Sequence, residues 1–400
     1  MFRLNKEWKV RLGVFRNDRR SYLSFLMLVS LFLLTLPAEM ICNVRPLVIV
    51  VDGKPHFPIL VTYSEKDFGG SLPSEPDYKS KSFSELLSGV SATTDSEGTG
   101  LGLDLGDFED EEDNNAIPEP LNDILQNSPR DFWMVWPPVR YDYKYIPTES
   151  NTGNVVLAAP YQTESPIGKG SIESSWADGH YLGTDDRGRD VLARLIYGFR
   201  ISMIFGISLA ITGTIIGCLI GGTQGFFGGW VDLSGQRLTE IWGSIPRLYI
   251  LIILSSFLVP SALLLFLILN LTAWMGIAAY IRAEFLKIRN YEFVKAAKSL
   301  GVSNFKIMRR HILPNALTPV VTFFPFEVTA GILALVSLDF LNLGVPSPAP
   351  SLGELLAQGK NNLHAIWILL PTFVTLSLTI TLLTFVGEGV RNAFDPRKTL

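Results

Sequence analysis

Residues 291–315 read YEFVKAAKSLGVSNFKIMRRHILPN and lie between two long apolar stretches of the chain. Their pattern predicts two short amphipathic helices that meet at a turn. Gly301 suits the left-handed position after the first helix, Ser303 can cap the second helix, and Pro314 marks the start of the next apolar helix. The sequence therefore predicts a basic helical hairpin that connects two apolar helices.

The composition around this segment indicates a membrane protein. The 400 residues are 48% hydrophobic and only 18% charged, with a mean hydropathy of +0.28. Several stretches approach the ~20 apolar residues that a helix needs to cross a bilayer. This composition excludes an ordinary soluble protein, and membrane topology explains the basic residues without nucleic-acid binding. Two cysteines and four scattered histidines indicate neither a disulfide framework nor a metal site.

Six transmembrane helices, with both termini in the cytoplasm, give the most consistent topology. The membrane that they cross is then the inner (cytoplasmic) membrane. The predicted spans are residues 22–41, 201–222, two within 241–281, 316–341 and 366–387. The stretch 241–281 can be one long span or two spans broken at Pro260. Two spans place the basic residues from Arg282 to Arg310 on the same side as the basic N-terminus, as the positive-inside rule requires. The first span also resembles a cleaved signal peptide, but it is long and lacks a small-residue cleavage site.

The chain divides accordingly into five regions. They are a cytoplasmic N-terminus (1–21), helix 1 (22–41), an external loop (42–197), a membrane domain with helices 2–6 (198–390) that contains the basic hairpin within residues 287–314, and a cytoplasmic C-terminus (391–400). The external loop begins with a strand-like run and an Asp52-Gly53 turn. Its acidic middle, about residues 73–129, lacks the spacing of an EF-hand calcium site, so we predict a disordered insertion.

The hairpin resembles the EAA loop of ABC importer permeases, the cytoplasmic element that docks on an ATPase subunit. The matching residues are Lys295, Ala296, Ala297, Gly301 and Pro314, although the family usually has Glu where Lys295 stands. The resemblance implies that the paired alanines leave a face poor in side chains on which another protein sits closely. The alternative is an ordinary basic hairpin between transmembrane helices.

A second stretch, LGTDDRGRD at residues 182–190, resembles the signature of dipeptide and oligopeptide importer permeases. The match continues through Arg194, Gly198, Arg200 and Ser202, and further matches follow at 310–315 (RHILPN), 339–341 (DFL), 350–353 (PSLG) and 394–396 (FDP). The stretches 57–60, 63–70 and 359–363 are similar to permeases of the microcin C-type peptide importer. The acidic middle of the external loop is an insertion relative to these permeases.

This resemblance implies an all-α polytopic membrane protein with the type I ABC importer permease fold and no cofactor of its own. It also implies a second permease subunit, ABC ATPase subunits, an external solute-binding protein and a peptide substrate. The chain is then not an enzyme, because its partners hydrolyse ATP. In agreement, Gly168-Lys169 is followed by Gly170, where a Walker motif needs Ser or Thr.

Two features inside the spans suggest further roles. Gly213, Gly217 and Gly221 recur every four residues, so they share one helix face and allow a neighbouring helix to approach closely. That neighbour can belong to the same subunit or to a second permease. Glu327 is an acid inside an apolar span, and it either faces the translocation path or forms a structural hydrogen bond to a neighbouring helix or subunit.

Two other classes of protein remain as alternatives. An intramembrane enzyme needs paired catalytic groups, but Glu327 and Asp339 are separated by twelve positions, about 18 Å along a helix. A membrane-anchored scaffold whose external loop binds a partner leaves the ordered matches from Leu182 onward unexplained.

Overall fold

The computed structural model describes residues 6–88, 131–146, 156–161, 175–177, 179–258 and 261–395. The chain folds into two compact units, of which the first combines Met1–Ala38 with Tyr141–Leu400 and the second is Glu39–Arg140. The short helix α3 (Ala38–Ile41) lies at the boundary in the sequence.

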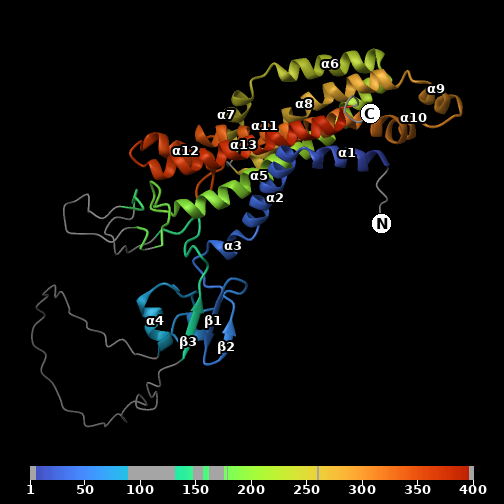
Figure 1. Cartoon of the computed structure of the whole chain (residues 1–400). Helices are drawn as coiled ribbons and strands as arrows, with labels where there is room; N and C mark the ends of the chain where they lie inside the picture. Colours follow the sequence, from blue (N-terminus) through green and yellow to red (C-terminus); the bar gives the residue numbers. More distant parts are fainter. Residues whose placement is uncertain are drawn as a thin grey trace, which may run out of the picture. The chain divides into compact units, whose positions relative to one another are not determined.

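Helices make up the regular secondary structure of the first unit in its described part (Figure 1). Its helices are α1 (Lys6–Asn17), α2 (Arg19–Thr35), α5 (Val191–Phe227), α6 (Gly229–Gly243), α7 (Arg247–Phe257), α8 (Ala262–Ile288), α9 (Glu292–Ser299), α10 (Asn304–Ile307), α11 (Leu313–Phe340), α12 (Leu352–Asn361) and α13 (Ile366–Phe394). A π-helical turn, Met308–Ile312, joins α10 to α11. Helices α9 and α10 lie at one end of the bundle and α12 lies at the other (Figure 1).

Among the described residues, four helices are long and apolar enough to cross a membrane. They are Val191–Phe227, Ala262–Ile288, Asn304–Phe340 and Ile366–Phe394. The predicted first span coincides with α2, which has 17 residues, and the predicted third span contains α7, which has 11. The chain between α6 and α7 breaks at Pro246, which lacks a backbone N–H, so residues 241–258 are not one continuous helix. The structure thus supports four of the six predicted spans by length and composition.

Helix α5 begins earlier than predicted, at Val191 instead of near residue 198, because Asp190 caps it. The Asp190 carboxylate accepts a hydrogen bond from the Ala193 N–H at 2.7 Å. This bond satisfies one of the N–H groups that the first turn of a helix leaves unpaired. Ser351 caps α12 in the same way, through bonds from Gly353 and Glu354.

The core of the first unit forms where α5 packs along α8 and α11, and where α11 and α2 pack on α13. Fully buried apolar side chains fill the interior between α2, α5, α11, α12 and α13; they include Met203, Val328, Ile332, Leu352 and Leu383. A second cluster, described below, joins α8 to the segment that precedes α11.

The glycine face of α5 packs against α8 within this chain. A Cβ added to Gly221 would lie 2.2 Å from the Ala278 carbonyl oxygen, and one added to Gly217 would lie 2.9 Å from Ile277. At Gly213 the corresponding distance to Ala273 is 3.3 Å. The sequence left open whether this face packs against a helix of the same subunit or of a second permease. The structure places α8 of the same chain against it.

The second unit contains a three-stranded antiparallel sheet with strand order β2-β1-β3. Strand β1 (Val48–Val51) pairs with β2 (Lys54–His56) through the predicted turn, where Asp52 and Gly53 both adopt positive φ. Strand β3 (Phe132–Val135) pairs with the other edge of β1, so that Val50 faces Trp133 across the ladder. The sheet buries Ile49 and Val51 against the 3₁₀ turn Glu65–Phe68 and helix α4.

Helix α4 (Lys81–Ser88) lies in the stretch that we predicted to be disordered. Its Phe83 and Leu87 side chains are buried together with Tyr78 and Phe68. The structure therefore differs from the prediction at the start of the insertion, because aromatic residues spaced between polar ones give this part of the loop a core. Residues 89–130, with the acidic run, lie outside the described residues.

Candidate coupling surface and buried ionic cluster

The segment between α8 and α11 adopts the predicted turn. Helix α9 ends in a Schellman motif, in which the Gly301 N–H donates to the Lys298 carbonyl at 3.0 Å and the Val302 N–H donates to the Ala297 carbonyl at 3.1 Å. Gly301 occupies the left-handed position with φ of +75°. Ser303 stands at the N-cap of α10, but its side chain makes no capping hydrogen bond.

One side of this segment anchors it to the bundle. Val294, Ala297, Ile307 and Ile312 are buried in a cluster with Ile281, Phe285 and other apolar residues of α8. Ala297 is only 7% exposed. The two alanines therefore do not share a docking face, because Val294 and Ala297 are three residues apart and point inward together. Ala297 lets α9 approach its own subunit closely.

The opposite side of the segment is exposed. It presents Lys295, which pairs with Glu292 at 3.0 Å, and the small side chain of Ala296. Leu300 is 83% exposed and Phe305 is 70% exposed, one on each side of the Gly301 turn. Sequence reasoning missed both apolar residues, although the position of Leu300 next to a left-handed glycine indicates that its side chain leaves the helix. Four of these exposed residues form what we call the coupling surface: Lys295, Ala296, Leu300 and Gly301.

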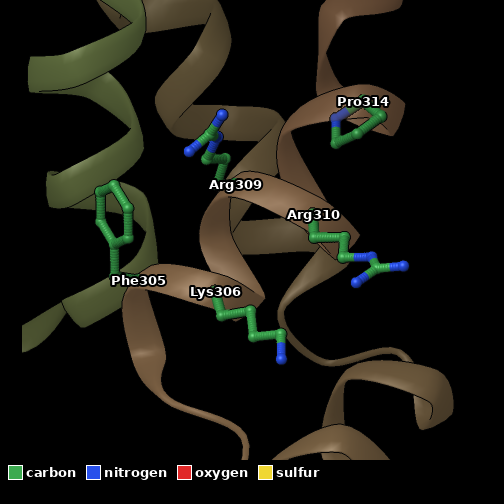
Figure 2. A pocket seen from close by; sticks show the side chains of 5 residues that line it. All are labelled: Phe305, Lys306, Arg309, Arg310 and Pro314. Atoms are coloured by element: carbon green, nitrogen blue, oxygen red, sulfur yellow. The ribbon is translucent and has the colours of Figure 1, made fainter.

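Next to the coupling surface lies a hollow of about 460 Å³. It is lined by Phe305, Lys306, Arg309, Arg310 and Pro314, and we call it the basic hollow. Figure 2 shows Lys306 and Arg310 extending on the same side of the ribbon, with Pro314 beyond them at the start of α11. All five residues are exposed.

At the other end of the bundle, the signature 182–190 forms a compact turn that carries an ionic cluster. Arg189 contacts Asp185 at 2.7 Å and Glu354 at 3.2 Å. Arg194 contacts Glu354 at 2.5 Å and Asp185 at 3.4 Å. The two arginine side chains are 2% and 0% exposed, and the Glu354 side chain is 16% exposed. Two carboxylates and two guanidinium groups thus balance each other in a site almost closed to water.

The electrostatics of this cluster keep its charges in place. Burial by itself lowers the pKa of Arg189, but the Asp185 and Glu354 carboxylates outweigh burial and raise it above its ordinary value. Asp186, in the same turn, is half-buried, and burial and the neighbouring Asp185 raise its pKa. Arg189 therefore remains charged and acts as a crosslink between the signature turn and α12.

Two further contacts extend this cluster. His180 Nδ1 lies 2.9 Å from the Asp190 carboxylate, and its ring stacks on Tyr141 with 3.8 Å between centroids. On the other side, Ser351 donates to Asp339 near the end of α11, and Asp339 also accepts from the Val345 N–H at 2.7 Å. The signature turn, α12 and the end of α11 are thereby joined through polar contacts.

Glu327 lies away from both sites, in the middle of α11. It is half-buried, and its Oε1 would lie 3.9 Å from a Cβ placed on Gly276 of α8. Pro325 lies inside the helix two residues earlier and has no backbone N–H to donate to the preceding turn. The structure therefore places this acid beside α8.

The chain matches a known family over its helical part. The family described as the binding-protein-dependent transport system inner membrane component matches residues 195–400. The peptidoglycan transport system permease protein YejE of Agrobacterium fabrum is 42% identical over 393 residues, which cover 96% of this chain and 92% of that protein. The inner membrane ABC transporter permease protein YejE of Escherichia coli is 38% identical over 400 residues, which cover 100% of both chains.

Another relative matches a shorter part of the chain. The oligopeptide transport system permease protein OppC of Escherichia coli is 38% identical over 220 residues, or 55% of this chain and 73% of that protein. The matched family spans the bundle and the coupling segment described above. The chain therefore belongs to the family of inner membrane components of binding-protein-dependent transport systems and is a non-catalytic permease subunit of an ABC transporter.

Proposed function

We propose that this chain forms the translocation path of a peptide importer together with a second permease, and that separate ATPase subunits drive it. The peptide class follows from relatives that are described as peptidoglycan and oligopeptide permeases. An external solute-binding protein would deliver the substrate. The observation that carries the proposal is the segment between α8 and α11, whose buried side is fixed to the bundle while its coupling surface stays open.

The geometry of this segment suits the transfer of motion between proteins. The Schellman motif at Gly301 holds α9 and α10 in a fixed angle, and the buried cluster around Ile307 and Ile312 ties both to α8 and α11. An ATPase subunit that binds Leu300 and Ala296 would move α9 and α10 when it moves. ATP binds the closed ATPase pair more tightly, so the permease equilibrium shifts as the ATPases close.

We further propose six transmembrane helices with both termini in the cytoplasm. In this arrangement α2 and α7 are shorter than the ~20 helical residues that a bilayer core needs. The residues that flank each helix in the sequence complete the crossing. The second unit then lies outside the cell membrane. The basic segment from Arg282 to Arg310 lies on the cytoplasmic side, as the positive-inside rule requires. Within this path Glu327 either contacts the substrate or holds α11 to a neighbour.

The coupling proposal is tested with the whole transporter in liposomes. We expect Leu300→Asp to lower ATP-driven peptide uptake by roughly tenfold or more, because burial of a leucine in a partner contributes about 1.5–3 kcal/mol. The matched control is Leu363→Asp, since Leu363 is also an exposed leucine, at 72%, but lies in the loop before α13. Normal uptake by Leu300→Asp, with the variant fully inserted, would contradict the coupling role.

The topology is tested by labelling single cysteines in intact cells. The background carries Cys42→Ser and Cys218→Ala, and the reporters are Ser303→Cys in the coupling segment and Lys54→Cys in β2, both at exposed positions. A membrane-impermeant thiol reagent should label position 54 and leave position 303 unmodified until the cells are opened. Labelling of position 303 in intact cells would overturn the orientation.

A further inference from the structure

The basic hollow contains three cations that have no partner within the described part of the chain. The side chains of Lys306, Arg309 and Arg310 form no ion pair or hydrogen bond with another described residue. They stand three and four positions apart, where like charges on a helix repel each other. Such a group is stable where an anion from outside the chain can balance it.

Two other cations near this region are satisfied within the chain. Arg282 pairs with Asp232 through two hydrogen bonds, and Arg289 donates to the carbonyl oxygens at the end of α5. The contrast shows that the fold supplies partners for basic residues where it needs them as crosslinks. The three cations of the basic hollow can therefore bind an anion from outside the chain.

The backbone holds these cations in a fixed position. Ile307 and Ile312 lie on either side of Arg309 and Arg310 in the sequence, and both are fully buried in the cluster with α8. The π-helical turn Met308–Ile312 lies between them. Such turns are rare and occur frequently at functional sites. The arginines are therefore presented from an anchored segment and not from a loose loop.

The hollow also has an apolar wall. Phe305 and Pro314 line it beside the cations, at the point where the apolar helix α11 begins. An anion that fits has both negative charge and apolar surface, and it lies level with the end of a transmembrane helix. A phospholipid with an acidic headgroup has this combination, and basic pockets beside helix ends bind such headgroups.

We propose that the basic hollow is a binding site for an anionic phospholipid of the cytoplasmic leaflet, whose phosphate is held by Lys306 and Arg310, with the charge of Arg309 at the edge of the hollow adding to the attraction. Phe305 packs on the glycerol and the first carbons of the acyl chains. The assignment to that leaflet rests on the orientation proposed above. A lipid bound here contacts the segment that joins the coupling surface to α11, so the headgroup content of the membrane would influence coupling.

The test measures lipid binding to the purified transporter complex in a neutral detergent by native mass spectrometry. The probes are dioleoylphosphatidylglycerol and dioleoylphosphatidylcholine, and the variant combines Lys306→Gln, Arg309→Gln and Arg310→Gln. We expect wild-type protein to prefer the anionic lipid and the variant to bind it at least tenfold less tightly, since one basic residue contributes roughly fivefold. Binding of the neutral lipid should not change.

The matched control removes the same charge elsewhere, through Arg237→Gln, Lys287→Gln and Lys298→Gln at exposed positions outside the hollow. It should bind the anionic lipid as wild type does. Equal loss in both triple variants would show that net charge alone attracts the lipid and would overturn the site. Phe305→Ala should weaken lipid binding severalfold, and an unchanged affinity would refute the proposed apolar contact.

Two further measurements separate this site from other anion sources. Inorganic phosphate at millimolar concentration should not displace the lipid, because phosphate cannot make the apolar contact with Phe305. If phosphate does displace the lipid, the hollow is a site for free phosphate and the lipid proposal fails. If the variant binds the lipid normally but loses ATPase subunits during purification, the cations serve a protein contact and the proposal fails. Because binding is read directly, the result does not depend on whether the complex transports peptide.

Discussion

Glu354→Gln should destabilise the protein strongly, because it leaves one buried positive charge without a partner. The cluster of Asp185, Glu354, Arg189 and Arg194 is neutral, and both arginine side chains are nearly inaccessible to water. Removal of one partner from a buried ionic pair costs about 3–5 kcal/mol. We expect the melting temperature in detergent to fall by roughly 6–20 °C, at about 2–4 °C per kcal/mol for a domain of this size.

The control is Glu240→Gln, which removes an acid paired with Arg237 at the same 2.5 Å distance but with both side chains more than half exposed. An exposed pair contributes ~0–1 kcal/mol, so this variant should melt close to wild type. Comparison of the two variants separates burial from distance. If Glu354→Gln melts no lower than Glu240→Gln, the cluster does not crosslink the signature turn to α12, and the reasoning is refuted. Adding Arg194→Met to Glu354→Gln should recover part of the loss, because the buried site becomes neutral again.

Four further substitutions test other parts of the molecule. Gly221→Ala should lower the melting temperature by an amount equivalent to about 1–3 kcal/mol, because the new Cβ meets the Ala278 carbonyl oxygen at 2.2 Å. Gly276→Ala has room and should melt at or above wild type. Gly301→Val should cost roughly 1–2 kcal/mol at its left-handed position and uncouple ATP hydrolysis from uptake. If Glu327 lines the path, Glu327→Gln should reduce uptake of cationic peptides more than neutral ones; equal loss with poor assembly would establish a structural role.

Local features of the fold were predictable where a few neighbouring residues determine them. The turn at Gly301 follows from a glycine after an amphipathic helix, and the β1–β2 turn follows from Asp52-Gly53. The inward orientation of Ala297 also had a local signal, since Val294 stands one turn earlier on the same face. The break before α7 had a signal as well, in Pro246, which the uniform apolarity of the stretch concealed.

The ionic cluster was not predictable from spacing because its members come from distant parts of the chain. Arg194 and Glu354 are separated by 160 positions, and only the packing of α12 on α5 and α11 brings them together. The matched signature contained Asp185, Arg189 and Arg194, and Glu354 directly follows the matched PSLG stretch. The sequence thus held the members of the cluster without showing that they meet.

Helix α11 connects the two sites that the structure assigns to opposite ends of the bundle (Figure 1). It starts at Leu313, directly after the π-helical turn, and its end is held by Asp339, which accepts hydrogen bonds from Ser351 and Val345. A helix of 28 residues spans about 42 Å. Movement of the coupling segment therefore pulls on a helix whose far end is bonded to the N-cap of α12, the helix that carries Glu354. The polar contacts around α12 give that end a fixed point against which α11 can tilt, and Pro319 and Pro325 lie inside the helix between the two ends, where prolines make a helix easier to bend.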